Sequence, residues 1–243
     1  MKLIIATPSP FARKVRVVLR EKAIDCEEIV DVPWNKNTMT TGLNPLGKIP
    51  ILINDGIEPI FDSKNIVEYL EQMRPEPRFH PENQSQKLKA SLIETAADGV
   101  CDAVVLIFLE NSRSRDLRSK AWIDRQKEKI YQGLQYLSDA LSAEKYFIDA
   151  HFTIADIAVF CCLEYLDLRF PEFDWRNEHS NLDNFWQTHQ SRQSFLETKP
   201  TAQVIEPLSE QKKRFRFNKS VTWLAPAPHH FCAATLARIF QTS

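Results

Sequence analysis

Two serines stand where helices are predicted to begin, and a helix start is a place where a protein can hold an anion. Ser9 precedes Pro10 and an amphipathic run, and Ser63 precedes a second such run. The first turn of a helix presents backbone N–H groups without partners at the positive end of the helix dipole. A serine there either caps the helix or joins the amides in binding a negative group. The local sequence leaves both roles open for each serine.

A second group of candidate residues lies between these serines. Segment 44–50, with the sequence NPLGKIP, predicts a turn that leads into a strand. Asp62 directly precedes Ser63. Each feature alone is typical of an ordinary turn or an ordinary helix start. Neither feature indicates a binding site by itself.

Other polar and sulfur-bearing residues favour structure over chemistry. Thr153 and Asp156 have the spacing of a capping box, with Phe152 and Ile157 placed as a hydrophobic staple, and this arrangement needs no ligand. The five cysteines are scattered and form no CxxC, so neither a disulfide framework nor a zinc site is indicated, and we expect reduced thiols and no metal. Cys161 and Cys162 lie in an apolar run and are expected to be small core residues.

The elements that position these residues follow the order βαβ and then ββα. Strands are predicted over 3–6, 26–30, the end of 44–53 and 58–61. Helices are predicted to follow Ser9 and Ser63, each serine serving as the N-cap. In the first helix, Arg13, Lys14 and Arg16 are expected on a solvated face. In the second, Ile66, Val67, Leu70 and Met73 form the expected apolar face. This half of the chain, residues 1–75, predicts a mixed α/β domain.

The remainder of the chain changes character. Three prolines within residues 75–81 predict a linker over 76–83. Helical spacing then dominates residues 84–207, including Leu88 and Leu92, and predicts an all-α domain. The final segment, 208–243, is a basic tail that contains aromatic residues, with no Asp or Glu from 211 onwards. We expect the tail to be mobile; the alternative is that it packs back over a binding cleft.

Composition excludes several classes of protein. A chain of 243 residues with 43% hydrophobic and 26% charged residues is long enough for two globular domains. It has no uninterrupted apolar run of about 18 residues that would span a bilayer. The 31 basic and 32 acidic side chains give a net charge of -1, so charge supplies no argument for nucleic acid or a membrane as partner. The first residues do not resemble a signal peptide, and we expect a cytoplasmic protein.

Taken together, these motifs resemble the cytosolic glutathione transferase family. The resemblance is carried by SPFA at 9–12, NPLGKIP at 44–50, FDS at 61–63 and TIAD at 153–156, and it covers about residues 1–207. It implies a thioredoxin-like first domain that binds glutathione, followed by the all-α domain. It also implies that the second domain contributes most of the site for a small electrophilic co-substrate. A homodimer is implied as well, in which Asp98 is placed to reach a partner's ligand.

The resemblance assigns the catalytic position to Ser9. A thiol with a pKa of about 8.5 is mostly protonated at neutral pH, so the enzyme must favour the thiolate. Ser9 would donate a hydrogen bond to the sulfur and would not itself attack; Thr7 is an alternative donor. Some classes of the family carry Cys-Pro-Phe here and exchange disulfides, which Ser9 cannot do. The departure favours conjugation or peroxide reduction.

The glutathione-binding residues implied by the resemblance come from both halves of the first domain. Pro50 is expected in the cis form, so that the backbone of Ile49 pairs with the cysteinyl residue of the ligand. Asp62 is expected at its ammonium group and Ser63 at the γ-glutamyl carboxylate. The glycyl end is expected to meet Lys48, with Trp34 and Lys36 as further candidates.

Two other functions remain open from the sequence. A protein could keep this fold without catalysis and bind a macromolecular partner, which the basic tail favours and the intact ligand motifs oppose. A glutathione-dependent isomerase would use the same residues and differ only in its co-substrate.

Overall fold

The computed structural model describes residues 1–205. The basic tail predicted over 208–243 therefore lies outside the described residues. Within the described part, no helix is both long enough and apolar enough to cross a membrane. The predicted boundaries at residues 75 and 84 stay predictions, although one helix ends at Met73 and the next begins at Gln84.

A four-stranded mixed sheet forms the first half of the chain. Its strands are β1 (Lys2–Ile5), β2 (Glu27–Val30), β3 (Ile51–Ile53) and β4 (Ile60–Phe61), in the spatial order β2-β1-β3-β4. β1 runs parallel to β2, because a helix crosses over between them, and antiparallel to β3. β4 pairs antiparallel with β3. The predicted strands are confirmed.

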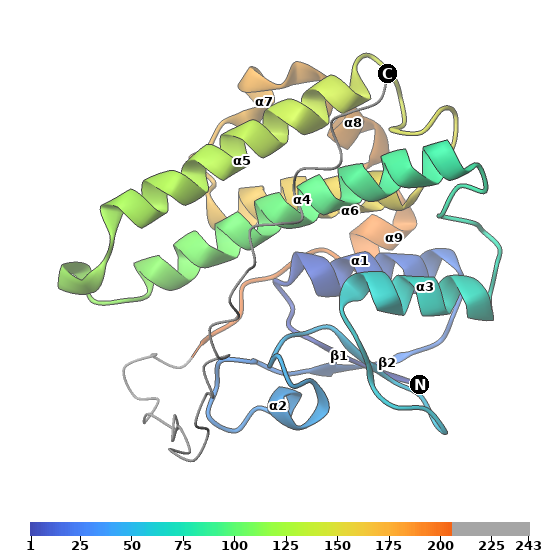
Figure 1. Ribbon diagram of the computed structural model, residues 1–243, viewed down its shortest axis with the longest axis horizontal. Coiled ribbons are helices and arrows are strands. Elements are labelled where there is room, and N and C mark those ends of the chain that lie inside the picture. Colours follow the sequence, from blue (N-terminus) through green and yellow to red (C-terminus); the bar gives the residue numbers. More distant parts are fainter. Residues whose placement is uncertain (206–243) are drawn as a thin grey trace, which may run out of the picture. The chain divides into compact units, whose positions relative to one another are not determined.

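Helices α1 (Pro10–Glu21) and α3 (Ser63–Met73) cover one face of this sheet, and the short α2 (Thr40–Leu43) lies on the other side (Figure 1). α1 places Val15, Val18 and Leu19 in the core. α2 was not predicted, because four residues that include Gly42 show no helical periodicity.

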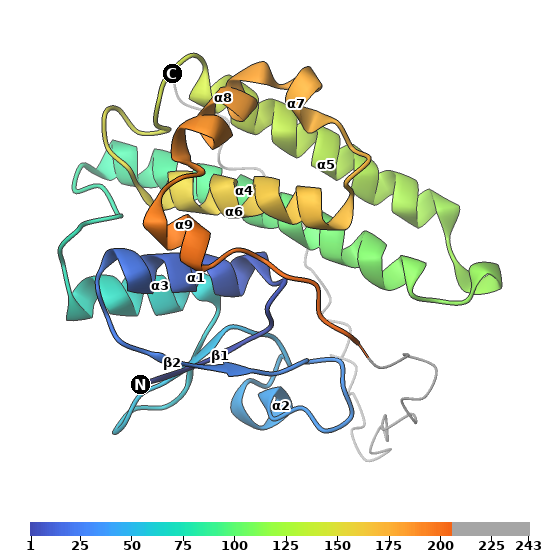
Figure 2. The same cartoon turned by 180° about the vertical axis from the view of Figure 1, so that it is seen from behind.

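The second half of the chain is helical, which confirms the predicted fold class. Its elements are α4 (Gln84–Asn111), a short 3-10 helix η1 (Arg115–Leu117), α5 (Lys120–Leu141), α6 (Ile154–Arg169), α7 (Trp175–Glu178), α8 (Ser180–His189) and α9 (Gln193–Glu197). α6 packs against both α4 and α1, and most of its residues are buried. It is the central helix that joins the two halves, as Figure 2 shows from behind.

The start of α6 is the predicted capping box. The Asp156 carboxylate accepts hydrogen bonds from the Thr153 backbone N–H at 2.7 Å and the Thr153 hydroxyl at 2.8 Å. It also accepts the Phe147 N–H at 3.1 Å. Complete burial outweighs these bonds and raises the pKa of Asp156 to about 6. Cys161 and Cys162 lie further along the same helix in the core, as predicted, and burial raises the pKa of the Cys161 thiol to about 12.

The basic face of α1 differs from its prediction. Arg13 and Lys14 are each only 1% exposed, so the expectation of a solvated face is wrong for them. Lys14 Nζ contacts Glu94 at 2.7 Å and Asp98 at 2.8 Å, both on α4. Arg13 contacts Glu164 of α6 at 2.5 Å. Each of these carboxylates lies 80 or more residues after the cation it pairs with, so local spacing could not reveal them.

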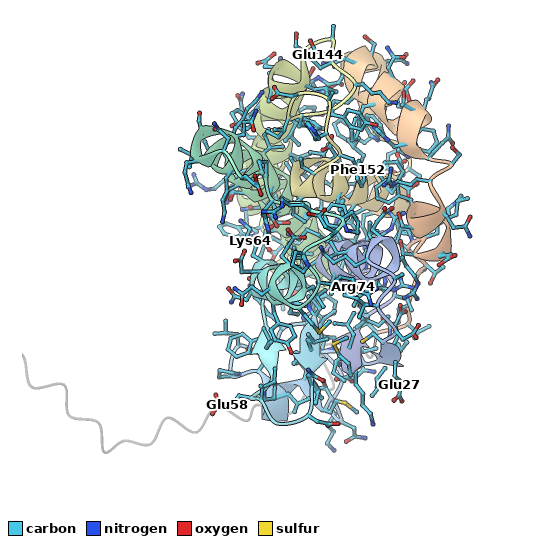
Figure 3. All side chains as sticks on the ribbon, turned by 90° about the vertical axis from the view of Figure 1, so that its right-hand side faces the viewer. Glu27, Glu58, Lys64, Arg74, Glu144 and Phe152 are labelled. Carbon is cyan, nitrogen blue, oxygen red and sulfur yellow. The ribbon has the colours of Figure 1, made fainter. Side chains whose placement is uncertain are left out.

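A second cation reinforces the junction between α1, α3 and α4. Lys64, at the start of α3, lies toward α4 (Figure 3) and donates to Thr95 at 2.7 Å. Its Nζ is also 3.8 Å from Asp98. Burial and Glu94 raise the pKa of Asp98, while Lys14 and Lys64 oppose the shift. The two halves of the chain are therefore joined by buried charge pairs as well as by apolar contacts.

Three large apolar residues of the predicted helices are exposed, among them Met73 of the expected apolar face of α3. Met73 of α3 and Leu88 and Leu92 of α4 are 44%, 62% and 52% exposed. Leu88 and Leu92 are four residues apart and share one face of α4. No element of the described chain covers these side chains.

Candidate active site

Ser9 is the N-cap of α1, and its hydroxyl is available as a donor. Its Oγ accepts the backbone N–H of Ala12 at 3.2 Å, and its own N–H donates to the Ala6 carbonyl at 3.0 Å. Among residues 1–205, no acceptor receives the Ser9 O–H. The side chain is partly exposed. Capping thus fixes the oxygen in place while the hydroxyl hydrogen stays free to bind another group.

Thr7, the alternative donor, is committed to a different contact. Its hydroxyl donates to the Thr201 carbonyl at 3.0 Å, and the Thr201 N–H approaches the Thr7 carbonyl at 3.4 Å. The segment after α9 therefore pairs with the loop that follows β1 (Figure 2). This contact joins residues far apart in the sequence and could not be foreseen from it.

The turn over 44–50 presents the backbone before β3. Asn44 is buried and organises the turn, because its side chain binds both the Leu46 N–H and the Lys48 carbonyl, at 2.9 and 2.8 Å. Gly47 has a φ of +61°, a conformation that side chains rarely adopt. The Ile49–Pro50 peptide bond is cis, as predicted. Ile49 precedes Ile51, the first paired residue of β3, so its N–H and C=O lie outside the ladder.

The start of α3 uses Asp62 rather than Ser63 as its cap. Asp62 Oδ1 accepts the Lys64 N–H at 2.9 Å, and Ser63 is the first residue of the helix. The prediction that Ser63 caps this helix is therefore wrong. Asp62 has a φ of 65°, an unfavourable backbone conformation for a non-glycine residue, and its side chain is exposed. Ser63 is buried in the first turn of α3.

Asp102 of α4 is a neighbour of these charges that the sequence did not single out. Desolvation raises the pKa of its carboxyl, the positive charge of Lys48 opposes the shift, and the negative charge of Asp62 adds to it. The turn before β3, the start of α3 and the middle of α4 therefore share one electrostatic environment. The helical periodicity of α4 continues through this region, so the sequence pattern did not mark Asp102 as a candidate site residue.

Trp34 links the first half of the chain to the helical half. It follows β2, and its ring lies 6.3 Å from that of Phe108 on α4. The guanidinium carbon of Arg169, the last residue of α6, lies 4.0 Å from the centre of the Phe108 ring. Lys36 is exposed in the same loop as Trp34. Phe108 and Arg169 were not predicted as site residues.

Other described features fall outside this constellation. Both oxygens of Asp98 accept from Lys14 of the same chain, so its role toward a partner's ligand stays a prediction. A surface hollow of about 430 Å³ lies beside the linker, lined by Glu68, Glu71 and His80 among others, and none of the predicted site residues lines it. The described residues contain no cluster of His, Cys, Asp or Glu that could hold a metal ion.

Comparison with known proteins matches both halves of this arrangement. Residues 8–73 match the glutathione S-transferase N-terminal domain, and residues 120–185 match the C-terminal domain of the same family. The uncharacterized GST-like protein YibF of Escherichia coli K12 is 34% identical over 205 residues, which cover 82% of this chain and 98% of YibF.

Solved structures agree with the sequence comparison. A glutathione S-transferase from Methylobacterium radiotolerans, in complex with glutathione sulfonate, superposes with a TM-score of 0.82 at 40% identity, covering 84% of this chain and 97% of that one. A glutathione S-transferase from Methylobacillus flagellatus with glutathione bound gives a TM-score of 0.79 at 38% identity, covering 82% and 99%. The chain belongs to the glutathione S-transferase family of enzymes.

Proposed function

We propose that this protein is a glutathione transferase in which Ser9 stabilises the thiolate of bound glutathione. The sulfur then attacks a small electrophile. For an aryl chloride, a C–S bond forms, chloride leaves with the bonding electron pair, and the thiol proton passes to solvent. Glutathione is the only small molecule besides the electrophile that this reaction needs.

The observation that carries the proposal is the state of the Ser9 hydroxyl. Its oxygen is fixed by the Ala12 N–H, and its hydrogen has no acceptor among the described residues. A donor held in this way, at the positive end of α1, favours a negative sulfur over a neutral thiol. Thr7 is the weaker candidate because its hydroxyl already donates to Thr201.

The remaining groups suit the three charged parts of glutathione. The unpaired backbone of Ile49 would pair with the cysteinyl residue. Asp62, exposed and ionisable, would bind the ammonium group, and Ser63 with the first amides of α3 would bind the neighbouring carboxylate. Lys48, whose positive charge acts on Asp102, would meet the glycyl carboxylate, with Trp34 and Lys36 as further candidates. The relatives with glutathione or glutathione sulfonate bound support glutathione as the ligand.

We also propose that the protein is a cytoplasmic homodimer. Met73, Leu88 and Leu92 place large apolar side chains in water on adjacent helices, and a second copy of the chain would cover them. Replacing Leu88 and Leu92 together by Glu should convert a dimer to a monomer in analytical ultracentrifugation. A wild-type protein that sediments as a monomer would contradict the proposal.

The function is tested by binding and turnover together. Titration calorimetry should detect glutathione binding to the wild-type chain, and 1-chloro-2,4-dinitrobenzene should be conjugated. Asp62→Ala should weaken glutathione binding about tenfold, because it removes the partner of the ammonium group. The matched control Asp55→Ala removes an exposed carboxylate from the β3–β4 turn and should leave binding unchanged. A wild-type protein that gives no heat with glutathione would contradict the enzyme assignment and favour a partner-binding role.

A further inference from the structure

One arginine of the described chain differs from the other buried or half-buried arginines in having no carboxylate partner. Six arginines of the described chain are buried or half-buried: Arg13, Arg16, Arg20, Arg169, Arg176 and Arg192. Five of them form ion pairs with carboxylates of the chain. Arg169 forms none with any described residue. A half-buried guanidinium without a counter-ion is a group that an anionic ligand would complete.

The side chain of Arg169 is nevertheless held in a defined orientation. Its guanidinium lies over the Phe108 ring, with 4.0 Å between the guanidinium carbon and the ring centre. Its Nε donates to the Tyr165 hydroxyl at 3.3 Å. Stacking and this single bond fix the plane of the guanidinium, and its two terminal nitrogens donate to no group within residues 1–205. An arginine prepared in this way matches the two oxygens of a carboxylate.

The surroundings place this arginine on the glutathione side of the helical half. Phe108, which carries the stacked guanidinium, also contacts Trp34 from the first half of the chain. Asp102 lies less than two turns before Phe108 on α4, and the charges of Lys48 and Asp62 both affect the pKa of its carboxyl. Figure 2 shows the start of α1 and the ends of α4 and α6 on the same side of the molecule. The group of Trp34, Phe108, Tyr165 and Arg169, which we term the Arg169 cluster, therefore connects the loop after β2 with α4 and the end of α6.

We infer that the Arg169 cluster binds the acidic substituent of the electrophile, so that the preferred co-substrates are aromatic compounds that carry a carboxylate. The inference rests on the proposed function and adds to it the class of co-substrate. Phe108 and Trp34 provide aromatic surface for the ring of the electrophile. Arg169 supplies a bidentate partner for the carboxylate of the electrophile. The other buried or half-buried arginines of the described chain are already paired with carboxylates.

The test compares two electrophiles that differ only in charge, 4-chloro-3,5-dinitrobenzoate and its methyl ester. The wild-type protein should favour the acid over the ester relative to their uncatalysed rates with glutathione. Arg169→Gln should reduce this preference, measured as the ratio of kcat/KM values, by about tenfold to a hundredfold. Arg169→Lys keeps the charge without the planar fork and should restore part of the preference.

The control Arg125→Gln removes the same charge from an exposed position on α5 and should keep the wild-type ratio. An Arg169→Gln ratio equal to that of the wild type would overturn the inference. So would an equal loss with acid and ester, since a merely structural arginine at the end of α6 would affect both substrates alike.

Calorimetry with the two preformed glutathione conjugates separates this inference from the proposed reaction. Tighter binding of the acid conjugate, lost in Arg169→Gln, would support the role of Arg169 even if neither electrophile were turned over. Absence of turnover would then count against the proposed reaction alone. Equal affinity of the wild-type protein for both conjugates would overturn the inference whatever the turnover.

Discussion

Two helix starts, at Thr153 and at Ser9, use the same device for different ends. At Thr153 the hydroxyl and the backbone N–H both donate to Asp156, and the site is buried. At Ser9 the oxygen accepts a helix N–H, the hydroxyl hydrogen has no described acceptor, and the side chain is partly exposed. A cap that satisfies all its groups internally stabilises the fold. A cap that keeps one donor unused and exposed is suited to bind a ligand.

The largest effect is expected from a substitution that breaks the buried cap at Thr153. Asp156→Ala leaves the backbone N–H groups of Thr153 and Phe147 without their carboxylate inside the protein. We expect a loss of about 3 kcal/mol in the free energy of unfolding, because each buried unsatisfied donor costs about 1–3 kcal/mol. Urea denaturation followed by circular dichroism measures it. The control Asp139→Ala, which loses only an exposed bond to Gln135, should change stability by about 0.5 kcal/mol or less.

The next largest effect is expected from a substitution that removes the partly exposed cap at Ser9. Ser9→Ala should lower kcat/KM for 1-chloro-2,4-dinitrobenzene about a hundredfold, as expected for loss of one donor to a developing anion. Its free energy of unfolding should fall by only about 1 kcal/mol, the usual value of an N-cap. Thr7→Val is the matched comparison, since it removes a hydroxyl two residues away. A larger loss of turnover in Thr7→Val than in Ser9→Ala would assign the donor to Thr7.

A pH dependence sharpens the contrast between the two caps. The pKa of Asp156 in the folded protein is about 6, above its ordinary value of 3.8. Between these values the folded protein keeps a proton that the unfolded chain releases, so the contribution of this group is full below about pH 4 and is lost as the pH rises through 6. We expect about 2 kcal/mol of stability to be lost across this window. Urea denaturation from pH 4 to 7 measures the slope, which Asp156→Asn should remove and Ser9→Ala should keep.

The smallest effect concerns a third helix start, at Asp62. Because its φ is 65°, Asp62→Gly should be about 1 kcal/mol more stable than Asp62→Ala, although both lose the bond to the Lys64 N–H. Both variants should bind glutathione equally weakly. Thermal denaturation and calorimetry on the pair separate backbone strain from ligand binding. Equal stability of the two variants would show that the backbone relaxes.

Much of the fold and part of the site could be predicted because their signals are local. The strands, the longer helices and the capping box at Thr153 follow from neighbouring residues, as does the turn before Pro50. The burial of Lys14 could not be predicted in this way, because its carboxylate partners lie 80 and 84 residues away in the sequence. Asp62 rather than Ser63 caps α3, because the backbone becomes helical at Ser63, and residue type alone does not show where that happens.

Two features of the site depend on how the halves of the chain pack. The sequence leaves Thr7 as an alternative donor to Ser9, and only the structure shows that the Thr7 hydroxyl donates to the Thr201 carbonyl. Asp102, Phe108 and Arg169 lie on long helices whose periodicity shows which residues face inward but not what those residues meet. Their importance appears only once α4 and α6 are placed beside the loop that carries Trp34.

The central claim is tested most directly by the pKa of the thiol of bound glutathione. Ultraviolet absorbance of the thiolate, recorded across a pH titration of the wild-type complex and of Ser9→Ala, measures it without a co-substrate. The wild-type complex should titrate at least about one pH unit below the free thiol value of about 8.5, and Ser9→Ala should return most of that shift. An unshifted pKa in the wild-type complex, or the same lowered pKa in both proteins, would contradict the role assigned to Ser9.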